Sequence, residues 1–118
     1  MSNQRGDDPG RYNKKLSIYR YTEIRDALNQ RKTVLKKLRT VWAELVPVRG
    51  TEFLESYKDA NQLQYKIHCR YIKGLTEKDV LVYKDRQFEI TSIINISEAN
   101  VTLEIYCTEW KDKKVLYE

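Results

Sequence analysis

Residues 62–71 alternate strictly between polar and apolar side chains, and no other feature restricts the fold of this chain as much. The apolar set is Leu63, Tyr65, Ile67, Cys69 and Tyr71. A period of two residues is typical of an antiparallel strand with one buried and one solvated face. Shorter segments of the same character recur at 16–21, 80–84, 88–94 and 101–108. The sequence therefore predicts a mainly β fold, a small antiparallel β-barrel or sandwich of five to six strands.

An excursion at about residues 22–36 interrupts this strand pattern. An amphipathic helix fits the segment, with Thr22 as its cap and with Ile24, Leu28 and Leu35 on one stripe. The tip of a long hairpin, turning near residues 27–30, fits it equally well. The residues alone leave helix, hairpin and long loop open for this excursion.

The next strand is expected over residues 37–48, where apolar side chains occur on both sides. Such a strand is either buried on both faces or carries a β-bulge. Pro47 is expected to end its regular pairing, because proline has no N–H to donate. Residues 50–60 then predict one short helix, capped by Thr51 and with Phe53 on its apolar face.

At 118 residues the chain has the length of one domain. We expect a disordered N-terminal tail over 1–13, a single β-barrel domain over 14–110 and a C-terminal tail over 111–118, whose Val115, Leu116 and Tyr117 would pack only against a partner. No apolar run is long enough to predict a membrane span, and no secretory signal is recognisable at the N-terminus. The expected site of the chain is therefore the cytoplasm in which it is made, unless a larger assembly carries it out.

Positive charge is concentrated in one quarter of the chain. Residues 11–39 hold ten basic and two acidic residues, a net charge of +8, whereas residues 40–118 carry −2. A polyanion or an acidic protein surface is the usual partner of such a region. The alternative is a solvated face with no partner.

Residues that could carry chemistry are scarce. The single histidine, His68, lies on the polar face of its strand and is expected to be solvated, and Cys69 and Cys107 are expected to be buried free thiols. Neither a nucleophile motif nor a glycine-rich loop is present. We therefore expect no catalytic residues, no cofactor and no metal site, and no enzyme activity.

Three blocks of sequence resemble the head–tail joining (head-completion) proteins of long-tailed bacteriophages, from about Gly10 to Glu109. The first is residues 41–44 followed by Pro47, Gly50, Glu52 and Phe53; the others are residues 88–95 and 103–107. The resemblance implies a small barrel with a short helix and a long loop, which favours a loop or hairpin for the excursion. It also implies that Trp42, Pro47, Gly50 and Phe53 are structural, packing the helix onto the barrel, and that Phe88, Ile90 and Leu103 are core.

What such a family does follows from the same resemblance. Its members form a ring under the portal of the capsid, which extends the DNA channel, helps to retain packaged DNA and provides the tail docking surface. The expected partners are the portal protein, tail or neck proteins, other copies of the chain and packaged double-stranded DNA, with no membrane. The expected location is the virion, after assembly in the bacterial cytoplasm, and the isolated chain is expected to be a monomer.

The basic excursion is the candidate contact with DNA. The residues expected to face the channel are Arg31, Lys32, Lys36, Lys37 and Arg39. Relatives are often acidic or glycine-containing in this segment, so both DNA and an acidic portal surface stay open as its partner. Two alternative functions also remain, a stand-alone nucleic-acid-binding barrel and a tail-side terminator or neck adaptor.

Overall fold

A computed structural model of the chain describes residues 11–48 and 64–117. Seven strands and one 3₁₀ turn lie in these two ranges. Their bounds are β1 Lys14–Arg25, β2 Arg31–Pro47, β3 Gln64–Arg70, β4 Val80–Tyr83, β5 Arg86–Asn95, η2 Ile96–Glu98, β6 Thr102–Glu109 and β7 Leu116–Tyr117. The predicted mainly β class is confirmed.

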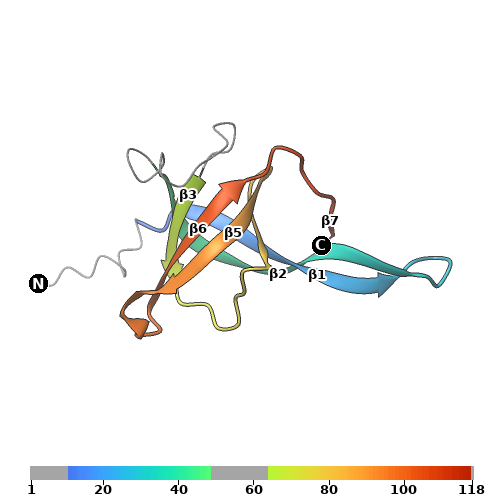
Figure 1. Cartoon of the computed structure of the whole chain (residues 1–118), viewed down its shortest axis with the longest axis horizontal. Helices are drawn as coiled ribbons and strands as arrows, with labels where there is room; N and C mark the ends of the chain where they lie inside the picture. The colour runs from blue at the N-terminus through green and yellow to red at the C-terminus, as the bar shows by residue number, and fades with distance from the viewer. Residues whose placement is uncertain (1–10, 49–63, 118) are drawn as a thin grey trace, which may run out of the picture.

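Six of the strands close into an antiparallel barrel. The sheet order is β1-β4-β5-β6-β3-β2, and β2 pairs back with β1 to complete the circle. Figure 1 shows β1 and β2 running on together beyond the barrel as one long hairpin. Of the two predicted architectures, barrel and sandwich, the barrel is correct.

The excursion at 22–36 is a hairpin and not a helix. β1 and β2 pair in register from Arg25↔Arg31 back to the barrel, and only residues 26–30 form the turn. Asp26 shapes this turn, because its carboxylate Oδ1 accepts hydrogen bonds from the backbone N–H groups of Leu28 and Gln30, each at 2.9 Å. Asn29 adopts a left-handed conformation with φ 65°, which asparagine tolerates better than most residues.

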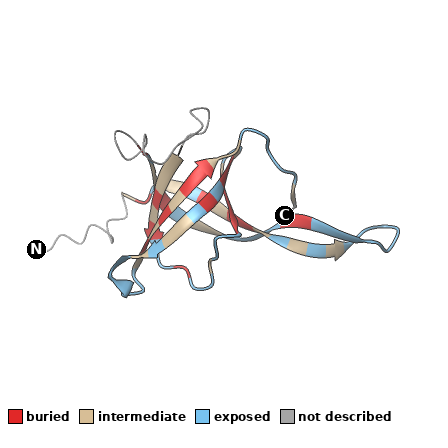
Figure 2. Ribbon diagram, viewed as in Figure 1, coloured by how far each residue is buried: buried red, intermediate tan, exposed pale blue. Residues whose placement is uncertain are grey.

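The main core fills the barrel with inward-facing residues of all six strands and with Ile72, which follows β3. It contains Leu16, Ile18, Ala43, Ile67, Cys69, Ile72, Leu81, Phe88, Ile90, Leu103, Ile105 and Cys107. Phe88 is fully buried and meets the ring of Tyr65 edge to face, with the ring centroids 5.4 Å apart. Buried residues concentrate in the barrel, while the outer half of the hairpin is largely exposed (Figure 2).

Trp42 does not belong to this core, contrary to the expectation from the resemblance. Its side chain is 57% exposed. Val41 and Ala43 pack into the barrel, and because successive side chains of a strand point to opposite faces, Trp42 between them points outward. Pro47 is also exposed and is the last residue of β2.

The rest of that expected structural group lies outside the described residues. Gly50, Phe53 and the helix predicted over 50–60 all fall within residues 49–63, for which no structure is described.

The C-terminal segment packs against the rest of the chain, although it was expected to pack only against a partner. β7 runs parallel to β2, with Leu35↔Leu116 and Lys36↔Tyr117 paired. Leu116 packs against a second cluster of buried residues, Tyr19, Leu35, Val80 and Val82, together with Trp110. This cluster lies at the base of the hairpin, so apolar burial within the chain supplies what a partner was expected to supply.

Candidate nucleic-acid interface

The part of the hairpin beyond the barrel, residues 20–38, is called the basic arm below. Pairing of β1 with β4 ends at Tyr19, and pairing of β2 with β3 begins at Ala43. Residues 20–25 of β1 therefore pair only with β2. Six residues at 3.3 Å each carry the tip about 20 Å beyond the last contact with β4. Figure 1 shows the arm extending away from the barrel.

An ion pair between the partly exposed Arg20 and the buried Asp79 fixes the arm at its base. Arg20 donates from Nε to Asp79 Oδ1 at 2.7 Å and from Nη2 to Asp79 Oδ2 at 2.8 Å. The Asp79 side chain is fully buried and also accepts a hydrogen bond from the Thr76 N–H at 3.0 Å. Burial raises the pKa of Asp79, but the bonds from Arg20 and Thr76 and the charge of Arg20 outweigh it, so the net pKa lies below its ordinary value.

The C-terminal segment forms the second anchor. The amide of Gln87 is buried and binds the backbone of Lys114 twice, as donor to the carbonyl at 2.8 Å and as acceptor from the N–H at 2.7 Å. These bonds guide the chain toward β7, which pairs with the arm at Leu35 and Lys36. The base of the arm is therefore held between the Arg20–Asp79 pair and β7.

The five cations proposed for the channel all lie on β2 and are all exposed. Directly paired residues of an antiparallel ladder lie on the same face, so the register assigns each cation to a side. Lys32 pairs with Ile24 and Lys36 with Arg20 on one face, whereas Arg31 and Lys37 lie on the other. The arm thus presents positive charge on both faces.

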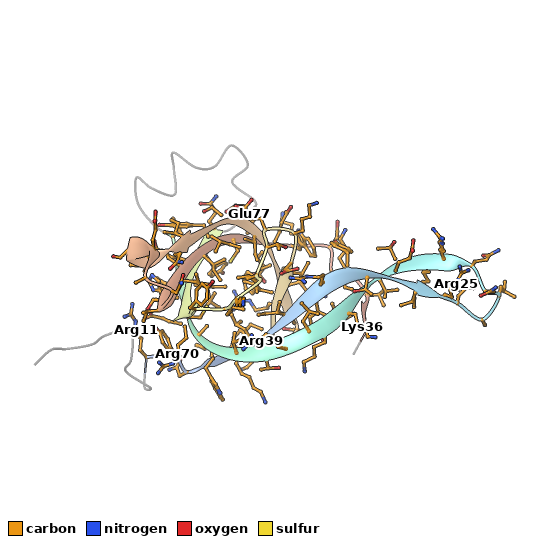
Figure 3. The ribbon with its side chains drawn as sticks, turned by 90° about the horizontal axis from the view of Figure 1, so that it is seen from below. Arg11, Arg25, Lys36, Arg39, Arg70 and Glu77 are labelled. Carbon is orange, nitrogen blue, oxygen red and sulfur yellow. The ribbon has the colours of Figure 1, made fainter. Side chains whose placement is uncertain are left out.

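A β-bulge at Leu38 decides where Arg39 points. Tyr19 pairs with Lys37 but Ile18 pairs with Arg39, so Leu38 is an extra residue in β2. In an uninterrupted strand of the same sequence, Arg39 would share a face with Lys37; because of the bulge, Arg39 pairs with Ile18 and shares the face of Lys36. A bulge was one of two predictions for this strand. Figure 3 shows Arg25, Lys36, Arg39 and Arg70 distributed from the arm tip to the barrel.

Three exposed cations of the arm, Arg31, Lys36 and Lys37, are at most weakly neutralised within the described residues. Arg31 Nε lies 4.0 Å from Glu23 Oε1, and both side chains are well exposed. Among residues 11–48 and 64–117, Lys36 and Lys37 make no ion pair. Exposed ammonium and guanidinium groups of this kind can contact phosphates without regard to base sequence.

His68 is the polar residue whose surroundings differ most from expectation. It was expected to be solvated, but its side chain is 14% exposed and lies between two carboxylates. Nδ1 is 3.1 Å from Glu44 Oε1, and Nε2 is 2.9 Å from Glu104 Oε2. The sequence offered no signal for this, because the partners are 24 and 36 residues away and meet only through strand order.

Nothing in the described residues points to catalysis or metal binding. Cys69 and Cys107 are buried free thiols as predicted, and burial raises the pKa of each to about 12, so the reactive thiolate is scarce. In the part of the chain that the structure describes, no group of three or more His, Cys, Asp or Glu side chains could hold a metal ion. No described helix is long and apolar enough to cross a membrane.

Comparison with known proteins adds a family and a fold. The family model described as phage head completion protein matches residues 7–110. The solution structure of a Shigella flexneri 2a protein is similar with a TM-score of 0.70 and 20% identity, covering 90% of this chain and 99% of that one. A chain in the virion of a native gene transfer agent particle has a TM-score of 0.61 and 14% identity, covering 85% and 96%. Both likenesses show the fold alone, and no curated protein matches the sequence.

Proposed function

This chain belongs to the family of phage head completion proteins, structural proteins of the phage head–tail region, and from that membership we propose how it acts. Copies form a ring beneath the portal, and the ring extends the DNA channel and presents a docking surface to the tail. The basic arm of each copy, with Arg39 at its base, lines or caps the channel, and the contacts with packaged double-stranded DNA come from Arg31, Lys32, Lys36, Lys37 and Arg39. The chain assembles in the host cytoplasm and ends in the virion.

The observation that carries this proposal is an arm anchored at its base whose exposed Arg31, Lys36 and Lys37 are at most weakly neutralised within the described residues. Contacts of lysine and arginine with phosphate are blind to sequence, which suits a genome that passes lengthwise. Each contact is weak at physiological salt, but contacts repeated around a ring add together. The ring would thereby resist leakage of DNA without preventing its ejection.

Ring closure requires two different surfaces on each copy. The arm and the barrel of this chain differ in shape and charge, which is compatible with such a head-to-tail contact. We propose that the isolated chain is monomeric and that the portal surface brings copies together. Light scattering on the purified chain tests this, and a stable ring without portal would contradict it.

The triple variant Lys32→Glu, Lys36→Glu and Lys37→Glu tests the channel role. All three side chains are exposed, so the fold should be kept and capsids should still fill with DNA. We expect the filled particles to leak DNA or to lose infectivity. A matched variant with Lys73→Glu, Lys78→Glu and Lys111→Glu changes the net charge equally at exposed positions off the arm and should behave as wild type.

Two outcomes would contradict the proposal. Full retention of DNA and normal infectivity in the arm variant would remove the channel role. Loss of portal or tail attachment with full DNA retention would instead indicate that the arm docks on an acidic protein neighbour.

A further inference from the structure

An open stretch of strand edge interrupts the pairing of β2. On the edge of β2 that faces away from β1, β7 pairs at Leu35 and Lys36, and β3 pairs from Ala43 to Pro47. Between them, residues 37–42 have no ladder partner on that edge within the described ranges. Barrels normally leave no edge open, because unpaired backbone N–H and C=O groups invite another strand.

A groove of about 610 Å³ lies along this open edge. Arg39, Val41 and Trp42 of β2 form one side, and Arg70 and Tyr71 at the end of β3 form the other. Trp42 and Tyr71 are 57% and 38% exposed, which is unusual for large aromatic side chains. The groove therefore combines an unpaired backbone edge with apolar and cationic side chains.

Tyr12 provides a second, independent observation that points to a binding site in this groove. It lines the groove and is only 5% exposed. Its hydroxyl is buried and has no hydrogen-bond partner among the described residues. Buried hydroxyl groups are nearly always hydrogen-bonded, so a polar atom of an occupant would satisfy it.

We infer that this groove binds an extended segment of another protein, which adds a strand to β2 beside residues 37–42. Strand addition takes its affinity from the backbone and its specificity from alternate side chains. Here the alternate side chains would be acidic ones facing Arg39 and Arg70, and apolar ones against Trp42 and Tyr71. Because this chain itself carries a net charge of +5, an acidic segment is expected from a different protein and not from a second copy.

The favoured occupant is a peptide and not a nucleic acid. A duplex is too wide to pair with a strand edge, and a phosphate backbone gains nothing from unpaired carbonyl groups. Six strand residues span about 20 Å, so a segment of about seven residues would fill the site. This docking site shares Arg39 with the DNA contact proposed for the arm, but binding of a peptide in the groove does not require that contact.

The probe for this site is a synthetic seven-residue peptide of alternating glutamate and valine. It is titrated into the full ¹⁵N-labelled chain, with backbone amide shifts and hydrogen exchange as readouts. Shifts are expected at residues 38–42 and 70–72, together with slowed exchange of edge amides. A peptide with lysine in place of glutamate, and one N-methylated at alternate residues to block pairing, should both fail to bind.

Charge reversal locates the contact on the protein. The variant Arg39→Glu with Arg70→Glu should weaken peptide binding at least about tenfold. Lys78→Glu with Lys111→Glu makes the same charge change at exposed residues that do not line the groove and should leave binding unchanged. An unchanged amide spectrum outside the groove shows that each variant is folded.

Several results would overturn the inference. These are no binding of the peptide at about 1 mM, equal binding of the N-methylated peptide, or shifts that map elsewhere. A duplex oligonucleotide that produces the same shifts and displaces the peptide would assign the groove to nucleic acid. Concentration-dependent self-association with protection of residues 37–42 would assign it to a second copy.

Discussion

His68 and Glu104 are direct cross-strand partners, and Nε2 of the one lies 2.9 Å from Oε2 of the other. On the opposite strand Glu44 pairs directly with His68, so one imidazole joins carboxylates of β2 and β6 across β3. Arg11 adds to this group, with Nε 2.8 Å from Glu44 Oε1 and Nη2 3.3 Å from His68 Nδ1. A charged ring can donate to both carboxylates, whereas a neutral ring protonated on Nε2 can accept from Arg11 at Nδ1. Only the charged ring therefore donates to both carboxylates.

Replacement of His68 by glutamine should weaken this three-strand connection. The side-chain amide of glutamine donates through its nitrogen and accepts through its oxygen. Its oxygen would therefore face one of the two carboxylates, to which it cannot donate a proton. We expect a loss of about 1–2 kcal/mol in unfolding free energy, measured by urea denaturation. Glu104→Gln, which keeps an acceptor for Nε2, should cost less. Equal effects of the two changes would show that the histidine is only a space-filling residue.

Asp79→Asn should destabilise the base of the arm, because it removes the charge that Arg20 binds. The expected cost is about 2 kcal/mol at neutral pH, less than for a fully buried pair because Arg20 is 41% exposed. The pKa of Asp79 is lower in the folded chain than its unfolded value of about 3.9. Its contribution is therefore complete above about pH 4 and is lost as the pH falls through the folded pKa.

Acid titration of stability provides the check on Asp79. Wild type should exceed Asp79→Asn by a constant margin at neutral pH, and the margin should shrink below about pH 4. Glu44, whose pKa is raised by burial but lowered further by the bonds from Arg11 and His68, adds loss in the same direction in both proteins. A margin that grows as the pH falls would contradict this account.

Gln87→Ala should release the C-terminal segment while the barrel stays folded. The change removes both hydrogen bonds to Lys114 and leaves Leu116 as the main remaining contact. Hydrogen exchange should then accelerate at Leu35 and Lys36, where β7 pairs with the arm, but not at Ile67 in β3. Uniform acceleration throughout the barrel would show that the segment supports the whole fold and not the arm alone.

Core and surface aromatics should respond in opposite ways. Phe88→Ala removes a fully buried ring and should cost about 3–5 kcal/mol. Trp42→Ala, at a 57% exposed position, should cost about 1 kcal/mol or less while weakening binding in the groove. Chemical denaturation of both variants gives the comparison. A larger loss for Trp42→Ala would restore the role in the core that the resemblance had implied.

The alternation of polar and apolar residues accounts for most of the fold that the sequence predicted. Strands β3, β5 and β6 follow from it because each has one dry face. Alternation could not decide whether the arm is a helix or a hairpin. An apolar helical stripe and a hairpin turn fit the same residues, and only the pairing of β1 with β2 in the folded chain distinguishes the two. Alternation also gave no position for Trp42, because β2 has apolar residues on both faces; the core role expected for it came from the resemblance, and its side chain is 57% exposed.

The candidate site could also be predicted only in part. Clustering of cations is a local property, so all five proposed residues could be named in advance. The anchors could not, because Asp79 meets Arg20 across 59 residues and Gln87 meets Lys114 across 27. Polar side chains become partners there only through the order of strands in the barrel.

Deletion of Leu38 tests whether the direction of the arm matters for function when its charge is kept. Leu38 is the extra residue of the bulge, so its removal joins Arg39 to Lys37 and leaves every other pair of β1 and β2 in register. The chain should therefore fold, and it should bind duplex DNA in solution with unchanged affinity and salt dependence, because the same cations stay exposed. A bulge bends its strand and increases the local twist, so the arm of the deletion variant should leave the barrel in a different direction. If the arm must be aimed at a channel, particles carrying this variant should lose DNA although its affinity in solution is normal. Normal retention would mean that charge alone is sufficient, and reduced affinity in solution would mean that the bulge holds the cations themselves in place.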